Sequence, residues 1–150
     1  MIEVLYPEPQ FRYKDEGGKR YIFDGLRRQW LLLTPEEWVR QNFLQYLQQV
    51  LNYPAALIAL EKEIRLNELR KRFDILVYDA AHQPWLIVEC KAPEVPLAPH
   101  VLEQALRYNI SVPVPYLVIT NGAHTMGWIK QDDKLVSLSS LPPWPGSAGR

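Results

Sequence analysis

The chain has 150 residues, of which 47% are hydrophobic and 23% are charged, and this balance fits one globular domain with its own core. Its 17 basic and 17 acidic residues give a formal net charge of zero, which argues against a protein that holds DNA through bulk positive charge alone. A single cysteine excludes a disulfide framework, and no apolar run approaches the roughly 20 residues that span a bilayer. We therefore expect a cytoplasmic protein with no membrane partner.

The two ends of the chain differ from its middle. The pair Gly17-Gly18 separates FRYKDE from KRYIFDGL, a pattern typical of a turn, so residues 1–30 are predicted to form an N-terminal arm or hairpin. Residues 139–150 are rich in Pro, Ser and Gly and predict a flexible C-terminal tail. The main folded domain is then expected over residues 31–138.

The first helix is expected to begin at Thr34. Threonine is a favourable N-cap, Pro35 suits the first helical position, and Glu37 is placed for a capping box with Thr34. Apolar residues then recur along one helical face, at Val39, Phe43, Leu47 and Val50. The pattern predicts a helix over residues 34–51.

Segments with strand composition follow this helix. Aromatic and β-branched residues are frequent in them, and Asn-Gly or Pro-containing turns separate several of them. A second helix is expected from about His100 to Asn109. The predicted strands are 56–66, 73–78, 85–91 and 116–120, with 125–130 as a further candidate. The first half of 56–66 is also compatible with an extension of the helix. Strands and helices in this order indicate an α/β fold with a mixed sheet.

Charged residues end one of the most apolar strands. Residues two apart in a strand point to the same side, so Glu89 and Lys91 share a face about 7 Å apart, while Cys90 points to the core. Asp74 lies in the preceding strand, and one register of the two strands places it beside Glu89. An isolated Glu-x-Lys pair is commonly a solvated ion pair, but charges at the end of a buried strand need partners or a function.

Two carboxylates on adjacent strands are suitable ligands for Mg²⁺, which prefers carboxylate, water and phosphate oxygens. A nearby lysine can orient an attacking water or stabilise developing charge. The group Asp74, Glu89 and Lys91 therefore predicts metal-dependent hydrolysis of a phosphodiester. The basic run Arg70-Lys71-Arg72 could contact phosphates, although three such residues together are more often solvated.

Further polar residues lie on the two predicted helices. Gln104 and Tyr108 are four residues apart and share a helical face, which is compatible with a site or with an amphipathic helix. Glu36 and Glu37 either add a carboxylate to the site or stabilise the helix N-terminus through its dipole. The sequence alone leaves both alternatives open.

Five stretches taken together resemble the N-terminal nuclease domain of type I restriction enzyme R subunits, in the PD-(D/E)XK superfamily. They are TPEEWVRQNFLQYL, KRFDILVYD, WLIVECKAP, EQALRYN and YLVITNG. The resemblance implies a restriction-endonuclease-like three-layer sandwich, with a central mixed sheet of four to five strands flanked by helices. It also implies a DNA endonuclease that uses Mg²⁺, with Mn²⁺ as a substitute.

The resemblance assigns roles to residues that match the family's motifs. Asp74 and Glu89 correspond to metal-binding carboxylates, and Lys91 corresponds to the catalytic lysine. Gln104 and Tyr108 correspond to a Gln-x-x-x-Tyr element beside the site. The first-helix carboxylate, also a metal ligand, corresponds to Glu37 or, as the second choice, to Glu36.

The chain departs from the family pattern in one respect. The R subunits continue into an ATP-driven motor, whereas this sequence contains no G-x-x-x-x-G-K-[ST] motif. We expect DNA as the main partner, together with a homodimer or a partner restriction or motor subunit. The alternative is a catalytically silent nucleic-acid- or protein-binding module that needs a partner subunit.

Overall fold

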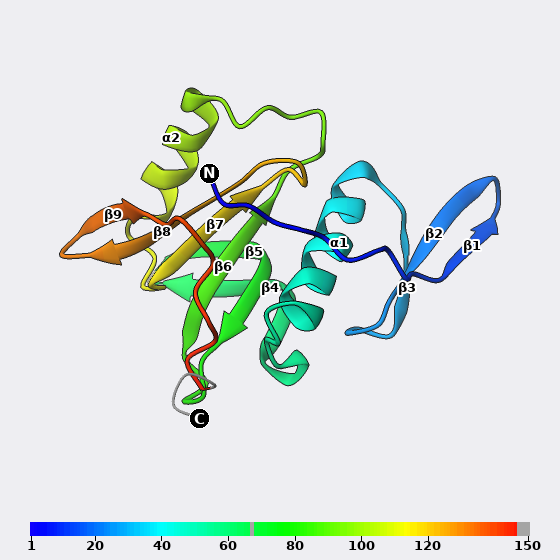
Figure 1. Cartoon of the computed structure of the whole chain (residues 1–150), viewed down its shortest axis with the longest axis horizontal. Helices are drawn as coiled ribbons and strands as arrows, with labels where there is room; N and C mark the ends of the chain where they lie inside the picture. The colour runs from blue at the N-terminus through cyan, green and yellow to red at the C-terminus, as the bar shows by residue number, and fades with distance from the viewer. Residues whose placement is uncertain (67, 147–150) are drawn as a thin grey trace.

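A computed structural model describes residues 1–66 and 68–146 (Figure 1). Its main sheet has six strands in the order β4-β5-β6-β7-β8-β9, and a separate sheet has the order β1-β2-β3. The small sheet comprises β1 (Tyr13–Glu16), β2 (Lys19–Asp24) and β3 (Gln29–Leu32). The main sheet comprises β4 (Ile58–Leu66), β5 (Leu69–Tyr78), β6 (Pro84–Cys90), β7 (Tyr116–Thr120), β8 (Thr125–Gln131) and β9 (Lys134–Ser137), and the helices are α1 (Pro35–Gln49), η1 (Ala55–Leu57) and α2 (Pro99–Asn109).

The main sheet is mixed, as the sequence predicts. Neighbouring strands are antiparallel except β6 and β7, which are parallel and joined through α2. A parallel pair needs a crossover connection, and a helix usually supplies it. Within the described residues, no helix is both long and apolar enough to cross a membrane.

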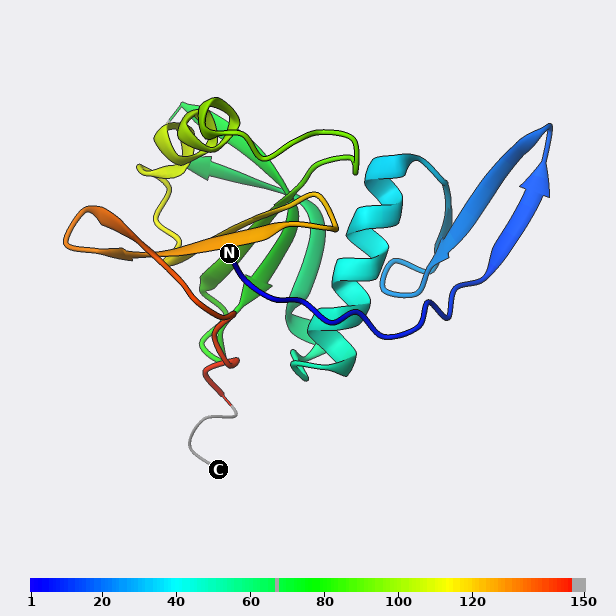
Figure 2. The same ribbon diagram turned by 45° about the horizontal axis from the view of Figure 1, so that its top comes forward.

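The two helices cover opposite faces of the main sheet (Figure 2). Ile75, Val77, Leu86 and Val88 pack in one apolar cluster with Val39, Phe43 and Leu47 of α1. Leu76, Ile87, Leu117 and Ile119 pack in a second cluster with Ala105 of α2. Because side chains alternate along a strand, these central strands are apolar on both faces, which explains their almost continuous hydrophobic sequences.

Helix α1 begins where the sequence predicts. Thr34 is the N-cap, and its Oγ1 accepts a hydrogen bond from the Glu37 N–H at 3.0 Å. The reciprocal bond of a capping box does not form, because the Thr34 N–H donates to Leu32 O and the Glu37 side chain binds other partners. Val50 follows the helix and is 45% exposed, so the apolar face ends at Leu47.

The predicted number of strands in the main sheet is wrong. The sequence indicates four to five, whereas the structure has six, because β9 was not recognised. Asp132 and Asp133 both have positive φ, at 51° and 62°, and form the two-residue turn between β8 and β9. This conformation favours a tight hairpin, so the short segment after the turn pairs back on β8.

Both ends of the chain contact the main sheet. Ile2 is buried and its N–H donates to Thr125 O at the start of β8. Leu141 is also buried, and the Tyr53 hydroxyl donates to Pro142 O. Residues 147–150 of the predicted flexible tail lie outside the described residues. The proposed division into 1–30, 31–138 and 139–150 stays a prediction.

The Thr34 cap gives a test of helix stability. We expect Thr34→Ala to lower the free energy of unfolding by about 1 kcal/mol, because the Glu37 N–H loses its acceptor. Urea denaturation followed by circular dichroism measures the change. Thr34→Ser keeps the hydroxyl and should retain most of the stability, and a serine variant as unstable as the alanine variant would contradict the capping role.

Candidate functional site

Strand β5 separates from β6 at Asp74. Its pairing with β6 runs from Ile75 to Tyr78, whereas its pairing with β4 continues to Leu69. On β4, Glu61 has a φ of +51°, an uncommon conformation for a residue other than glycine. Glu61 lies opposite Asp74, and these two residues are left out of the otherwise regular pairing of β4 with β5. The backbone irregularity therefore opens the main sheet beside Asp74.

Asp74 fills the opening between the two strands. The Cys90 N–H lies beyond the last residue pair of β5 and β6, and Asp74 Oδ2 accepts its hydrogen at 2.7 Å. Burial raises the pKa of Asp74, and the charges of Glu36 and Glu89 raise it further. The Cys90 N–H and the Arg40 guanidinium, 4.0 Å from Asp74 Oδ1, oppose this shift. Carboxylates thus converge on Asp74 from α1 and β6.

Glu89 is held by two buried partners. Its Oε1 accepts hydrogen bonds from Lys71 Nζ at 3.2 Å and from Asn109 Nδ2 at 2.9 Å. Asn109 is fully buried at the end of α2, and its Oδ1 accepts from Lys71 at 2.7 Å. Within the described residues, Glu89 Oε2 receives no hydrogen bond. One oxygen of this carboxylate is therefore fixed and the other is available.

Lys71 is a site residue that the sequence analysis did not assign. Its ammonium lies 3.6 Å from the centre of the Tyr108 ring, and its side chain is only 12% exposed. Burial lowers the pKa of Lys71, although the charge of Glu89 opposes that change. Arg70 and Arg72 on either side are exposed. Because side chains alternate along a strand, Lys71 must point to the side opposite its two neighbours, and this alternation could have identified it in the sequence.

A cavity of about 200 Å³ brings four predicted site residues together. Glu89 and Lys91 form its wall on the β6 side, and α2 forms the opposite wall. The α2 residues include Gln104 and Tyr108, both exposed, and Lys71 also lines the cavity. The Lys91 N–H donates to Thr120 O at 2.8 Å, which extends the parallel pairing and fixes the backbone of this lysine.

Glu36 and Glu37 occupy different environments. Glu37 is buried, and its carboxylate accepts hydrogen bonds from both Arg40 and Gln41. Glu36 is exposed, lines a second cavity with Arg40 and Glu61, and its charge raises the pKa of Asp74. Both glutamates therefore line this cavity, but the Glu37 carboxylate is buried and bound to Arg40, whereas Glu36 is exposed and its charge raises the pKa of Asp74.

Arg40 connects the site to the rest of the fold. Its guanidinium binds Glu37 and lies 3.3 Å from Glu61, which in turn binds Arg27 at 2.9 Å. Burial lowers the pKa of Arg40, but the hydrogen bond and charge of Glu37 raise it overall. Arg40 therefore stays charged and links α1 to β4. No sequence motif marked it, because arginine in an amphipathic helix is usually exposed.

The chemistry of the carboxylates fits a magnesium ion. Among the described residues, no group of three or more His, Cys, Asp or Glu side chains is arranged to hold a metal ion. Mg²⁺ needs fewer protein ligands, because it usually keeps several waters and binds one or two carboxylates together with substrate phosphates. Asp74 and Glu89 are two such carboxylates. Burial raises the pKa of Asp74, and the charges of Glu36 and Glu89 add to this shift, so a divalent cation would stabilise the ionised form of Asp74.

A family comparison covers most of this structure. The model for the type I restriction enzyme R protein N terminus matches residues 35–142. The chain belongs to this family. The domain is a member of the PD-(D/E)XK superfamily, as the sequence resemblance indicated. Among curated proteins, none matches the sequence.

The extent of the match divides the structure in two. The type I R-protein region begins at the first residue of α1 and includes the main sheet and both α-helices. Every predicted site residue lies inside it. The small sheet β1-β2-β3 lies outside it. The family match therefore includes the residues that line the cavity between β6 and α2, but it does not include residues 13–32.

The Arg40–Glu37 pair gives a second stability test. We expect Arg40→Met to lower the free energy of unfolding by about 3–5 kcal/mol, because it leaves the buried Glu37 carboxylate uncompensated. Adding Glu37→Gln should recover part of the loss. Arg107→Met removes an exposed ion pair on α2 and should change stability little. Equal effects of Arg40→Met and Arg107→Met in urea denaturation would contradict this role.

Proposed function

We propose that this domain is a metal-dependent nuclease that hydrolyses phosphodiester bonds in DNA. The observation that carries the proposal is that Glu89 and Lys91 line one cavity while Asp74 accepts a hydrogen bond from the N–H of Cys90, the residue between them, inside a type I restriction R-protein N-terminal domain. Hard oxygen ligands beside a lysine, in an open cleft, suit hydrolysis of an anionic phosphodiester without a covalent intermediate.

Asp74 and Glu89 would hold Mg²⁺, or Mn²⁺ in its place. The bound ion would supply Lewis-acid activation of water and neutralise charge on the phosphate. We assign Glu36, rather than Glu37, as the third carboxylate, because Glu36 is exposed and acts on Asp74 while both oxygens of Glu37 are occupied. Glu36 would act through a bound water or a shift of its flexible side chain.

The residues around the carboxylates position them. The Cys90 N–H fixes one oxygen of Asp74, and Lys71 with Asn109 fixes one oxygen of Glu89. Lys91 forms no ion pair with a described residue and lines the same cavity as Glu89, so its ammonium is free to orient water or to bind a phosphate oxygen. We propose Lys91 as the catalytic lysine and Lys71 as a positioning residue.

Gln104 and Tyr108 are proposed to contact the substrate from α2. Both are exposed on the wall of the cavity facing Glu89 and Lys91, where they would reach the backbone of a bound strand. DNA and partner subunits of a restriction system are the proposed partners. A homodimer stays a prediction.

Cleavage of DNA tests the proposed activity. Purified protein is incubated with labelled single-stranded, duplex and branched DNA in the presence of Mg²⁺ or Mn²⁺. We expect cutting that requires the metal and falls by at least about 100-fold in Glu89→Ala, as is usual when an ionic group of an active site is removed. Glu103→Ala, on the exposed part of α2, is the matched control and should cut normally. Equal cutting by the two variants would indicate a contaminating nuclease.

Metal binding separates the roles of the carboxylates and the lysine. Mg²⁺ should raise the melting temperature of the native protein, because a ligand that binds the folded state stabilises it. Asp74→Ala should abolish the rise. Lys91→Ala should keep the rise but lose cleavage. If Lys91→Ala instead loses the metal-dependent rise, the catalytic assignment of this lysine is wrong.

A further inference from the structure

The small sheet is positively charged in a chain that is neutral overall. Residues 11–32 contain six basic and three acidic residues, which gives this segment a net charge of +3 in a chain whose formal net charge is zero. Figures 1 and 2 show that β1 and β2 project away from the main sheet beyond α1. A projecting, basic segment is a candidate surface for a polyanion.

Aromatic rings and cations alternate on one side of this sheet. Residues paired across antiparallel strands project to the same side, and the pairs here are Lys14 with Tyr21 and Phe23 with Trp30. The opposite side of β2 carries Ile22 and Asp24, which are fully buried. We name the outer surface the aromatic face and define it by Arg12, Lys14, Lys19, Tyr21, Phe23 and Trp30. Glu16 lies on the same side, opposite Lys19, and its carboxylate is 3.3 Å from the Lys14 ammonium, so three cations and one carboxylate leave this face with a net charge of +2.

The cations of the aromatic face lie on its rings. The Arg12 guanidinium is 4.7 Å from the centre of Phe23, and the Lys14 ammonium is 4.9 Å from the centre of Trp30. Guanidinium groups and aromatic rings both offer flat surfaces on which unpaired bases stack, while their positive charges bind phosphates. In a duplex the bases are already stacked, so this combination favours a single strand.

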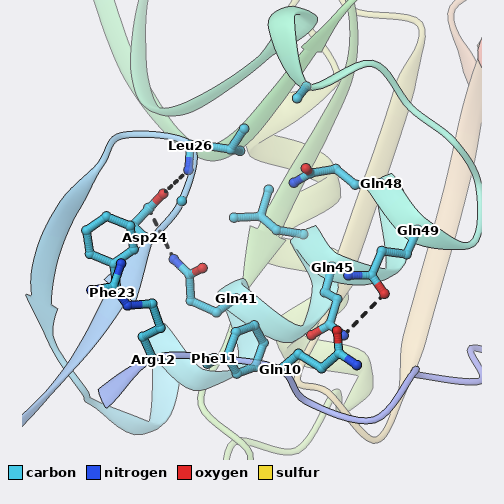
Figure 3. Close-up of a pocket in the computed structure, with 13 residues that line it drawn as sticks. Gln10, Phe11, Arg12, Phe23, Asp24, Leu26, Gln41, Gln45, Gln48 and Gln49 are labelled. Atoms are coloured by element: carbon cyan, nitrogen blue, oxygen red, sulfur yellow. Dashed lines mark hydrogen bonds between the residues drawn. The ribbon is translucent and has the colours of Figure 1, made fainter. Parts of the chain in front are cut away.

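A polar pocket adjoins the aromatic face. Figure 3 shows the residues that line this pocket, which lies between α1 and the segment around Phe23 and Asp24 and is also lined by Arg12. Its volume is about 360 Å³. Five glutamines line the cavity: Gln10, Gln41, Gln45, Gln48 and Gln49. Gln45 is only 7% exposed, and its Oε1 has no hydrogen-bond partner among the described residues. Glutamine amides recognise the edges of bases, and an unpartnered buried acceptor needs a donor.

We infer that single-stranded DNA binds across the aromatic face. Its phosphates contact Arg12, Lys14 and Lys19, its bases stack on the rings, and one base enters the glutamine pocket and donates to Gln45 Oε1. The inference rests on the proposed function in naming DNA as the substrate. The sheet is also close to the nuclease site, because β3 ends at Leu32 and α1, with Glu36, begins at Pro35.

Binding is tested separately from cleavage. Fluorescence anisotropy of labelled oligo(dC) and oligo(dT) is measured with the Glu89→Ala protein in EDTA, so that nothing depends on nuclease activity. We expect the triple variant Arg12→Gln, Lys14→Gln and Lys19→Gln to bind at least about tenfold more weakly, and its salt dependence (d log K/d log salt) to fall by about 2. The matched control removes three exposed cations elsewhere, through Arg65→Gln, Arg107→Gln and Lys134→Gln, and should bind as tightly as its parent.

Two further comparisons test the bases. Trp30→Leu keeps an apolar side chain but removes the ring, and should weaken binding by about fivefold to a hundredfold while circular dichroism shows that the protein remains folded. The parent should bind oligo(dC) more tightly than oligo(dT), because cytosine offers an exocyclic amino group to Gln45 Oε1, whereas the N3–H donor of thymine is flanked by two carbonyl oxygens that repel that acceptor. Gln45→Met should remove this difference.

Three results would overturn the inference. Equal affinities of the two triple variants would exclude the aromatic face as the DNA-binding surface. Duplex DNA that binds as tightly as the single strand would exclude stacking of unpaired bases on its rings. Equal or tighter binding of oligo(dT) by the parent protein would exclude the base in the pocket. If the native protein binds single-stranded DNA as expected but does not cleave it, the result would count against the proposed nuclease activity and not against the binding surface. The two proposals can therefore fail separately.

Discussion

The separation of β5 from β6 at Asp74 is the constraint on which the site depends. A sheet that continued past Ile75 would satisfy the Cys90 N–H with a backbone carbonyl and leave no room for a side chain. Because β5 diverges, that N–H needs another acceptor, and the Asp74 carboxylate provides it. The requirement that buried backbone groups be paired therefore orients an acidic side chain beside Glu89, in a protein whose central strands are otherwise apolar.

Internal cations then make this cluster of acids compatible with folding. Arg40 compensates Glu37, Lys71 compensates Glu89, and Arg27 compensates Glu61. Arg40 also lies 3.3 Å from Glu61, so these contacts join α1 and the β2–β3 turn to β4, and β5 to β6. The ionic contacts that offset the cost of burying charge therefore also fix the relative positions of the elements. Asp74 is compensated less than Glu37, Glu61 or Glu89, since Arg40 is 4.0 Å away and burial raises the pKa of Asp74.

Patterns of local sequence predicted much of the fold, and long-range packing decided the rest. The Thr34-Pro35 start, the apolar strands and the second helix ending at Asn109 follow from periodicity and capping, and they agree with the structure. The site was harder to predict, because the roles of Glu36 and Glu37 depend on the partners that α1 meets, and Lys71 acquires its role only through Asn109 and Tyr108 of α2. Strand β9 was not predicted because its pairing depends on the positive φ angles of Asp132 and Asp133, and the identity of these two residues does not by itself indicate a hairpin turn.

The balance of charge also constrains how a metal and a substrate would occupy the site. The five carboxylates around the site are Glu36, Glu37, Glu61, Asp74 and Glu89. They exceed the cations Arg40, Lys71 and Lys91 by two charges, because Arg27 also pairs with the buried Asp24. A divalent cation would offset this excess, whereas a phosphodiester alone would add to it. Metal and DNA should therefore each favour the binding of the other, because the cation removes the repulsion that the phosphate would otherwise meet in a partly buried cleft. The small sheet, with its net charge of +3, would add to the attraction for the strand without adding charge to the cleft itself.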